Sequence, residues 1–413
     1  MYIQRQLEQS LQLFLKRREA IAIIGPRQAG KTTFITHLGK ELEKDGKKVK
    51  LVTFENLGDL NLFQDSLEDF KSLAQEYDCV IIDEFQYAKN AGQKLKYLYD
   101  TTETKFIVSG SSSLELTFQT GKYMVGRMLE FKLMPFSFRE YLSVNNSDFY
   151  KLLSEKVDSR SIFDFKIKNG FGDEINRRLA GILEKYVVWG GYPACVLSRT
   201  EDEKRKVMGG IVEKYLLQDI SGLLHLATSD ELMKMSRFLA VQIGNLVNYS
   251  ELAEATGLSH REVLKHVSIL EKTFILDMVR PFFANRRTEL VKNPKNYFCD
   301  LGVRNFLISD FRPLDVRNDA GSVMENYAYN MLLNSGVAAR INFWRTKSQA
   351  EVDFIIGKEG GVYPIEVKYG SKKTIGKSFY NFIEKYNPKI GIILTKDYLS
   401  EEIIGKTKIK FIP

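Results

Sequence analysis

The sequence is poor in the residues that build disulfide frameworks and zinc sites. It has 3 cysteines and 4 histidines in 413 residues. Cys79, Cys195 and Cys299 lie far apart, without the short spacings of metal ligands. We therefore expect reduced thiols in the protein core and no zinc site.

Long hydrophobic runs are also missing. No apolar stretch reaches the roughly 18 residues needed to cross a bilayer, and the N-terminal residues lack the apolar core of a signal peptide. These absences predict a cytoplasmic protein without a membrane partner. The chain of 413 residues is too long for one core, which favours two or three domains.

A phosphate-binding loop is the clearest motif that is present. Its residues are Gly25, Pro26, Arg27, Gln28, Ala29, Gly30, Lys31, Thr32 and Thr33. An apolar run precedes the loop and a helical pattern follows it, which is the order that this motif requires. The glycines let backbone N–H groups surround phosphates, Lys31 neutralises the β- and γ-oxygens, and Thr32 ligates Mg²⁺. The motif predicts binding of ATP and Mg²⁺.

Two carboxylates end a second apolar run. Residues 79–82 lead into Asp83 and Glu84, in the form of a buried parallel strand. Asp83 is expected to hold Mg²⁺ through water, and Glu84 to polarise the water that attacks the γ-phosphate. An acidic pair alone is often an ordinary solvated strand end, but the preceding phosphate loop favours ATP hydrolysis.

A serine-rich turn follows the apolar run at 106–108. Ser109 or Ser111 is a catalytic candidate, because a hydroxyl after this strand can contact the γ-phosphate or the attacking water. Ordinary loop chemistry is the alternative.

Strand and helix patterns divide the chain into four segments. Residues 1–135 alternate helices with strands, typical of a parallel α/β sheet with its ligand at the strand carboxyl ends. Residues 136–228 indicate a helical lid and connector, 229–284 a winged helix-turn-helix, and 285–413 a further α/β domain. The expected strands of the first segment are 20–25, 49–54, 79–83, 105–109 and 128–132.

The helix-turn-helix is predicted from turn and cap residues. Ser250 and Ser259 are expected as helix N-caps, Gly257 as the turn, and residues 274–279 as a following strand. In many such modules the second helix reads DNA, whereas others only pack domains together. The residues expected to face the DNA groove are His260, Arg261, Lys265 and His266.

Positive charge is concentrated in the C-terminal part. Residues 280–413 hold 22 Lys and Arg against 14 Asp and Glu, so the whole excess of +8 lies there. This asymmetry favours an anionic partner such as DNA. A lysine-rich solvated surface is the alternative.

The last segment carries a second chemical pattern. Glu325 lies in a helical stretch, Asp353 in an expected strand at 350–356, and Glu366 and Lys368 in another at 363–368. An acidic residue followed by Glu-x-Lys about a dozen residues later is the layout of a restriction-type nuclease core. If the two strands pair as a hairpin, the three carboxylates can hold a second Mg²⁺ or Mn²⁺ while Lys368 orients water. Solvated sheets also carry such patterns, so a surface role stays open.

Taken together, these motifs resemble a prokaryotic ATPase family that joins an AAA-type P-loop domain to a C-terminal domain of unknown function (AAA_14 plus DUF4143). The resemblance covers nearly all of the chain. It implies a C-terminal fold similar to PD-(D/E)xK nucleases, and it implies that Arg127 reaches the γ-phosphate in its own chain or in a neighbour. A structural ion pair is the other interpretation of Arg127. The segments that carry the resemblance are 25–33, 82–86, 109–112, 126–127, 135–140, 190–193, 351–353 and 365–368.

Two function classes follow from this sequence. In the first, ATP hydrolysis is coupled to DNA binding and to metal-dependent DNA cleavage. In the second, the protein is a nucleotide-dependent signalling or defence switch, whose C-terminal domain binds a protein partner and cuts nothing. A homo-oligomer fits either class.

Overall fold

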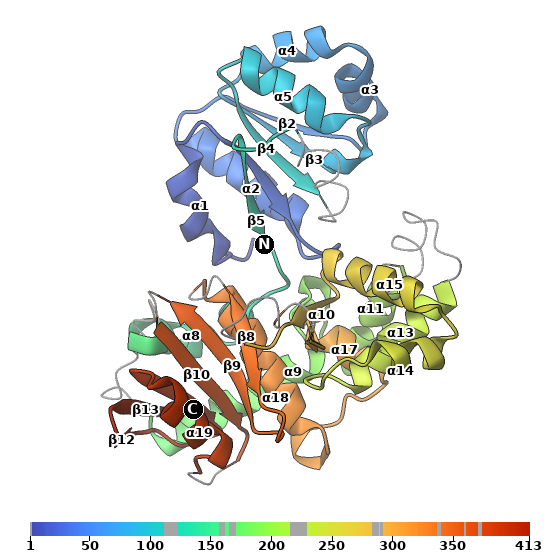
Figure 1. The fold of residues 1–413 in the computed structure, drawn as a ribbon. Coiled ribbons are helices and arrows are strands. Elements are labelled where there is room, and N and C mark those ends of the chain that lie inside the picture. The colour runs from blue at the N-terminus through green and yellow to red at the C-terminus, as the bar shows by residue number, and fades with distance from the viewer. Residues whose placement is uncertain are drawn as a thin grey trace. The chain divides into compact units, whose positions relative to one another are not determined.

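The computed structural model describes residues 2–110, 123–156, 162–164, 171–214, 229–282, 289, 292–336, 340–358, 361–370 and 374–413. The candidate Ser111 lies outside these residues. Backbone contacts divide the chain into two units, whose elements Figure 1 shows. The first unit is Met1–Phe136 with Tyr192–Leu197 and Val267–Ile275, and the second is Ser137–Gly191, Ser198–His266 and Leu276–Pro413.

The first unit contains a five-stranded parallel sheet in the order β2-β3-β4-β1-β5. The prediction of these strands is confirmed to within one residue at each end. The strands are β1 (Ala20–Ile24), β2 (Val49–Thr53), β3 (Cys79–Asp83), β4 (Lys105–Gly110) and β5 (Met128–Lys132).

Helices cover this sheet on both sides (Figure 1). They are α1 (Leu7–Leu15), α2 (Lys31–Lys44), α3 (Leu57–Asp65), α4 (Leu67–Gln75) and α5 (Ala91–Thr101), with a 3₁₀ turn at Phe85–Tyr87. Leu11 of α1 and Phe34 of α2 pack with Ile21 and Ile107 in one core cluster. Because both faces are covered, β1 and β3 are buried along their whole length, which explains why β1 is apolar throughout and β3 is apolar up to Asp83.

Helices form most of the middle of the chain. They are α7 (Phe138–Asn145), α8 (Ser147–Lys156), a 3₁₀ turn at Ile162–Asp164, α9 (Asp173–Trp189), α10 (Pro193–Leu197), α11 (Glu201–Val212) and α13 (Ser229–Val241). The expected interruption at 189–193 is present, since α9 ends at Trp189 and α10 begins at Pro193.

The helix-turn-helix consists of α14 (Tyr249–Thr256) and α15 (His260–Lys272). Gly257 ends α14 in the left-handed conformation, and Ser259 caps the start of α15 together with Glu262, as expected. The cap of α14 was predicted wrongly. Asn248, not Ser250, accepts the backbone N–H groups at that end. The helix begins at Tyr249, so Asn248 occupies the N-cap position, and an asparagine amide oxygen caps a helix as well as a serine hydroxyl does.

Two short strands follow the helix-turn-helix. β6 (Leu276–Val279) pairs antiparallel with β7 (Lys295–Phe298). β6 lies inside the predicted strand at 274–279. Helix α17 (Leu301–Leu307) and a 3₁₀ turn at Leu314–Val316 come next.

The C-terminal part is a mixed six-stranded sheet in the order β12-β13-β11-β10-β9-β8. Its elements are α18 (Ala320–Asn334), β8 (Ile341–Arg345), β9 (Glu351–Lys358), β10 (Gly361–Lys368), α19 (Lys377–Tyr386), β11 (Ile390–Thr395), β12 (Ser400–Ile404) and β13 (Thr407–Ile412). Tyr329 of α18 packs in one core cluster and Phe379 of α19 in another. The expected hairpin of β9 and β10 is present, with Phe354 opposite Ile365.

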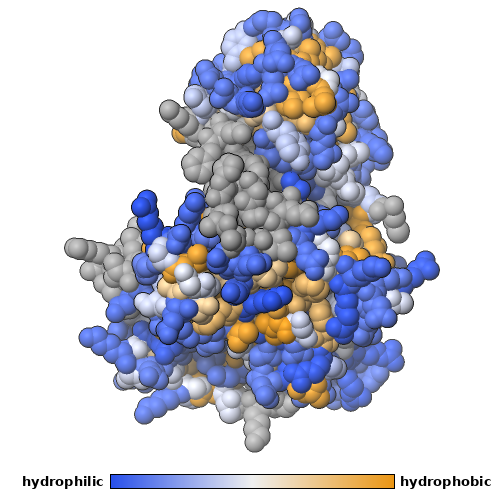
Figure 2. Space-filling view, turned by 90° about the vertical axis from the view of Figure 1, so that its right-hand side faces the viewer, coloured by the Kyte–Doolittle hydropathy of each residue, from blue (hydrophilic) through white to orange (hydrophobic). Residues whose placement is uncertain are grey.

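The face drawn in Figure 2 is mostly hydrophilic, with apolar side chains gathered in a few patches. Large exposed hydrophobic side chains among the described residues include Leu13, Leu57, Val125 and Ile403. Among the described residues, no helix is both long and apolar enough to cross a membrane.

Candidate nucleotide site and C-terminal carboxylate cluster

The predicted phosphate loop connects β1 to α2 at the carboxyl edge of the parallel sheet. Gln28 and Gly30 have positive φ angles of 61° and 93°. Gly25 has no room for a side chain, because a Cβ there would lie 2.1 Å from the carbonyl oxygen of Leu133. In the loop and first turn, Gly25, Pro26, Ala29 and Lys31 are buried, Arg27 and Gly30 are half-buried, and Gln28, Thr32 and Thr33 are exposed.

The Lys31 ammonium folds back onto the loop. Its Nζ donates to the carbonyl oxygens of Gly25 at 3.0 Å and Pro26 at 2.8 Å. Burial lowers the pKa of Lys31 to about 8, although the nearby carboxylates of Glu84 and Asp83 oppose this shift. The three groups expected to act on a triphosphate therefore interact electrostatically.

Asp83 is the centre of a small hydrogen-bond network at the end of β3. Its Oδ1 accepts the backbone N–H of Glu84 at 3.0 Å and also the hydroxyl of Ser109. Ser109 is fully buried on β4, which lies between β3 and β1 in the sheet. The strand order thus places Ser109 between the phosphate loop that follows β1 and the acidic pair at the end of β3.

Glu84 has an unusual backbone and a polar support. Its φ is 51°, a left-handed conformation that few non-glycine residues adopt. Gln86 Nε2 donates to Glu84 Oε2. Burial raises the pKa of Glu84, while Lys31 pulls it down. Sequence reasoning missed Gln86, although it lies two residues after the predicted base.

Arg5 is a second missed residue. It comes from the segment before α1, and its guanidinium donates to the carbonyl oxygens of Ala29 at 3.0 Å and Met134 at 2.5 Å. It also lies over the Phe136 ring at 4.8 Å. Arg5 thereby ties the phosphate loop to the segment after β5. A single arginine near the N-terminus carries no sequence signal for this contact.

Arg127 lies where the strands of the sheet begin, at the end opposite to the phosphate loop. It directly precedes β5, whose residues pair with Ala20–Ile24 of β1 in parallel. The five-residue length of β1 separates it from the phosphate loop by about 16 Å at roughly 3.3 Å per residue. Its Nε forms an exposed ion pair with Asp100 at 2.9 Å. Arg127 therefore does not approach the phosphate loop of its own chain.

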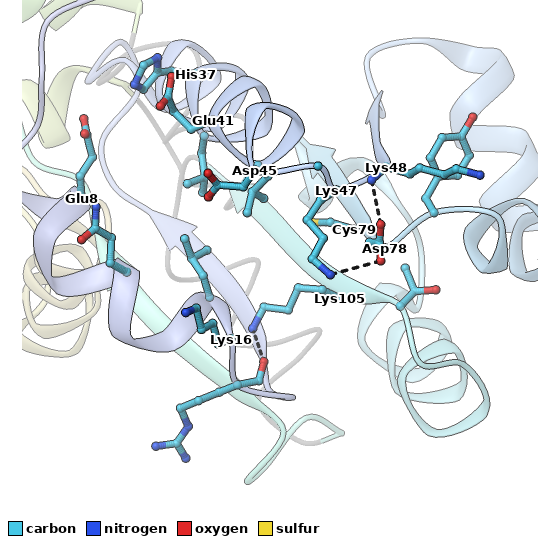
Figure 3. A pocket seen from close by; sticks show the side chains of 18 of the residues that line it. Glu8, Lys16, His37, Glu41, Asp45, Lys47, Lys48, Asp78, Cys79 and Lys105 are labelled. Atoms are coloured by element: carbon cyan, nitrogen blue, oxygen red, sulfur yellow. Dashed lines mark hydrogen bonds and ion pairs between the residues drawn. The ribbon is translucent and has the colours of Figure 1, made fainter.

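A wide groove lies at this amino edge of the sheet (Figure 3). It has a volume of about 2110 Å³ and is lined by Cys79, Lys105 and other residues at the strand starts. Asp78 holds the loop before β2 by accepting the backbone N–H of Lys48 at 2.8 Å. Side chains of both charges face the groove, among them Glu8, Lys16, Glu41 and Lys47.

The predicted residues of the C-terminal domain come together at one end of the β9–β10 hairpin. We use the name carboxylate cluster for Glu325, Glu351, Asp353 and Glu366. Asp353 Oδ2 accepts the backbone N–H of Val367 at 2.8 Å, and Lys368 Nζ pairs with Glu366 Oε1 at 2.7 Å. Sequence reasoning did not include Glu351.

Lys295 of β7 also lies in this cluster and was not predicted. Its Nζ is 3.0 Å from Glu325 Oε1 and 2.6 Å from Glu351 Oε1. Burial works to lower the pKa of Lys295, but the carboxylates of Glu325, Glu351 and Asp353 outweigh burial and raise it. Lys295 is thus held as a cation.

The buried acids of the cluster resist ionisation. Burial and then the charge of Glu325 raise the pKa of Asp353 well above its ordinary value. Burial also raises the pKa of Glu366, against the effect of Lys368. In the ranges that the structure describes, no three His, Cys, Asp or Glu side chains are arranged to hold a metal ion. The carboxylates meet, but they do not form a ready ligand set.

The second helix of the helix-turn-helix exposes part of the predicted surface. His260, Arg261 and Lys265 are exposed. The prediction that His266 faces DNA is wrong, because this ring is buried and its Nδ1 contacts the carbonyl oxygen of Glu262 at 2.7 Å. His266 lies on the helix side that also carries the buried Val263 and Leu270.

Family models match three segments of the chain. Residues 17–142 match an AAA domain, and residues 320–413 match a domain of unknown function, DUF4143. These two parts of the expected resemblance are confirmed. Residues 181–314 match another domain of unknown function, DUF8612, which we had not predicted.

Relatives resemble the chain along most of its length. An uncharacterized protein of Haemophilus influenzae is 24% identical over 396 residues, which cover 93% of this chain and 90% of that protein. An uncharacterized protein of Methanocaldococcus jannaschii is 24% identical over 419 residues, covering 96% of this chain and 84% of that protein.

Solved structures resemble it only weakly. The replication initiator DnaA bound to AMPPCP and single-stranded DNA has a TM-score of 0.30 at 14% identity, covering 65% of this chain and 90% of that chain. The Aeropyrum pernix Orc1 protein in complex with DNA has a TM-score of 0.31 at 14% identity, covering 75% and 93%. Likeness at this level carries no functional argument.

Proposed function

We propose that this protein is a Mg²⁺-dependent ATPase whose hydrolysis is coupled to DNA binding. The observation that carries the ATPase proposal is the grouping of Lys31, Asp83 and Glu84 at the carboxyl edge of one parallel sheet. The match of residues 17–142 to an AAA domain supports it.

The loop residues suit a triphosphate with its Mg²⁺. Thr32, exposed at the start of α2, and Asp83 would hold the ion, which neutralises charge on the phosphate oxygens. The Lys31 ammonium donates to two loop carbonyl groups. Anionic phosphate oxygens are stronger acceptors than neutral carbonyls, so ATP binding exchanges these hydrogen bonds for bonds to the ligand.

Glu84 is the proposed base. A carboxylate whose pKa is raised by burial holds a proton from water more readily than a free one. Gln86 donates to one oxygen of Glu84 and leaves the other to face the attacking water. Ser109 fixes Asp83 from the neighbouring strand.

Two variants test the ATPase proposal. Lys31→Ala abolishes ATP binding, whereas Glu84→Gln binds ATP while kcat falls by about 100-fold or more. The matched control is Glu103→Gln, whose side chain is 97% exposed and which leaves both quantities unchanged. Hydrolysis at the unsubstituted rate in Glu84→Gln would remove Glu84 as the base.

Coupling to DNA rests on the exposed basic side chains of α15. Arg261 and Lys265 are exposed on the second helix of the helix-turn-helix, and the positive excess of the chain lies in residues 280–413. Basic side chains that neutralise phosphates release counterions, so their contribution appears in the salt dependence of binding.

The DNA test uses a double variant, Arg261→Ala with Lys265→Ala. It lowers DNA affinity, reduces the slope of log K against log salt by about 2, and removes stimulation of the ATPase by DNA. Lys234→Ala with Arg237→Ala, both exposed on α13, is the control that keeps these properties. Equal salt slopes in the two double variants would exclude α15 as the DNA-binding helix.

For the C-terminal domain, two functions compete. The meeting of Glu325, Asp353, Glu366 and Lys368 supports metal-dependent DNA cleavage. The ion pairs of Lys295 argue against cleavage, because they engage carboxylates that a metal ion would need, and this leaves the other function, a domain that binds a protein partner and cuts nothing. Plasmid incubated with Mg²⁺ or Mn²⁺, with and without ATP, separates the two. We expect the plasmid to stay intact.

A further inference from the structure

Lys295 is built into the protein core next to the carboxylate cluster. Its side chain is 2% exposed. Its strand, β7, pairs with β6 so that Lys295 lies opposite Val279, and Leu246 bridges to Lys295 from another direction. The ammonium also lies 5.5 Å from the centre of the Phe343 ring. Its position is set by the fold, unlike that of a surface lysine.

The carboxylates of Glu325 and Glu351 already accept donors from the protein itself. Glu325 Oε1 accepts both Lys295 Nζ and the Tyr297 hydroxyl, the latter at 2.5 Å. Glu351 Oε1 pairs with the same ammonium, and its Oε2 accepts Arg345 at 2.7 Å. The protein's own donors thus bind one oxygen of Glu325, on α18, and both oxygens of Glu351, at the start of β9.

Glu366 differs from these two residues. It is 5% exposed, and its Oε2 is buried without a hydrogen-bond partner among the residues that the structure describes. Its charge interacts with those of Glu325 and Glu351. A buried carboxylate oxygen without a donor points to a cation as its partner.

A lysine ammonium and a divalent metal ion compete for the oxygens of the carboxylate cluster. Mg²⁺ and Mn²⁺ bind oxygen ligands in a tight shell, and ionised carboxylates supply one or more of them beside water. The Lys295 ammonium lies 3.0 Å from Glu325 Oε1 and 2.6 Å from Glu351 Oε1. This fixed positive charge repels a second cation nearby, and the repulsion is strong where water is excluded. Lys368 is less suited to exclude a metal ion, because its side chain is 38% exposed and forms an ion pair only with Glu366 among the described residues.

We propose that Lys295 is the resident cation of the carboxylate cluster and closes it to divalent metal. The residues of the nuclease-like pattern are present, but the ammonium of Lys295 occupies their shared ligand space. Removing that ammonium opens a site for Mn²⁺ among Glu325, Asp353 and Glu366. This proposal does not depend on ATP hydrolysis or on DNA binding.

The test measures Mn²⁺ binding to the full chain without nucleotide. An Asp83→Asn background removes the expected metal ligand of the ATP site, and the EPR signal of free Mn²⁺ reports binding. With Lys295 present, Mn²⁺ binding to the cluster lies below the detection limit of the titration. With Lys295→Met, one Mn²⁺ binds at least about tenfold more tightly than that limit, it raises the unfolding temperature, and a further Glu325→Gln change abolishes its binding.

Two further variants keep the test decisive. Lys410→Met is the matched control, because Lys410 is also buried and its Nζ donates to the Phe163 carbonyl oxygen; it gains no Mn²⁺ binding. If Lys295→Met alone does not fold, Lys295→Met with Glu351→Gln removes one unpaired charge as well. Mn²⁺ binding in the presence of Lys295 that Glu325→Gln abolishes would overturn the proposal, as would a folded Lys295 variant that binds none.

Discussion

The hydroxyl of Ser109 donates a hydrogen bond to Oδ1 of Asp83, 26 residues earlier in the chain. The two residues lie at the carboxyl ends of neighbouring parallel strands, Asp83 as the last residue of β3 and Ser109 as the last but one of β4, and both side chains are buried. The hydroxyl therefore orients the carboxylate that is proposed to hold Mg²⁺, and Ser109 is a positioning residue.

Ser109→Ala is expected to lower kcat about tenfold or more, because a hydrogen bond to a charged group contributes roughly 1.5–3 kcal/mol. It also raises the Mg²⁺ concentration needed for half-maximal rate. Steady-state ATPase assays at varied Mg²⁺ measure both effects. Ser72→Ala, an exposed serine that donates to the Glu68 carbonyl oxygen, is the control. An unchanged Mg²⁺ dependence in Ser109→Ala would exclude this role.

Arg127 is expected to act only between chains, since it lies at the amino edge of its own sheet. Arg127→Ala should leave turnover of dilute protein unchanged and remove any rise of specific activity with protein concentration. Asp100→Ala breaks the same ion pair but keeps the arginine, so the concentration-dependent rise should survive in it. Flat specific activity across a dilution series, with full activity in Arg127→Ala, would leave Arg127 as a surface ion pair.

Gly25 is expected to tolerate no side chain. The Leu133 amide donates to the carbonyl oxygen of Ile24 at 2.7 Å, and a Cβ on Gly25 would meet the Leu133 carbonyl oxygen at 2.1 Å. Gly25→Ala must separate the loop from β5, at a cost of about 1–3 kcal/mol, and should abolish ATP binding measured by titration calorimetry. Gly181→Ala, exposed in α9 with open space around it, should bind ATP normally and stabilise its helix by roughly 0.5–1 kcal/mol.

The strands of the first unit were predictable because their burial leaves a simple pattern. Residues 20–24 and 79–82 are buried on both faces and form unbroken apolar runs in the sequence. The hairpin that carries Asp353 and Glu366 was predictable for a similar reason, since turn residues separate two apolar stretches of matching length. Local sequence determines such features, and the structure confirms them.

The contacts of Arg5 and Lys295 were not predictable from local pattern. Each depends on a residue far away in the chain: Ala29 is 24 residues from Arg5, and Glu325 is 30 residues from Lys295. A lone basic residue looks the same in sequence whether it is solvated or buried against a partner. The prediction that His266 faces DNA failed for a related reason. Tertiary contacts, and not residue type, determine which side of α15 packs inward.

Asp300 is the basis of the last prediction, which concerns pH. Its Oδ2 accepts the Gly191 amide at 2.7 Å and its Oδ1 accepts the Val303 amide at 3.1 Å. Only glycine fits at position 190 beside this carboxylate, since a Cβ there would lie 2.2 Å from Asp300 Oδ1. Burial raises the pKa of Asp300 from 3.8 to about 6, although these amides work to lower it.

The sign of the pH effect follows from this raised pKa. The folded state holds the proton more tightly than the unfolded state, so the contribution of Asp300 to stability is fully present below pH 3.8 and is lost as pH rises to about 6. The free energy of unfolding of the unsubstituted protein, minus that of Asp300→Asn, should therefore fall by up to about 1.4 kcal/mol per pH unit in this window and stay level above pH 7. Other titrating groups cancel in the difference. Urea unfolding followed by tryptophan fluorescence measures it, because Trp189 and Trp344 both lie in the same unit as Asp300. A difference that stays constant from pH 4 to pH 8 would show that Asp300 is ionised throughout, held by the amides of Gly191 and Val303 despite its burial.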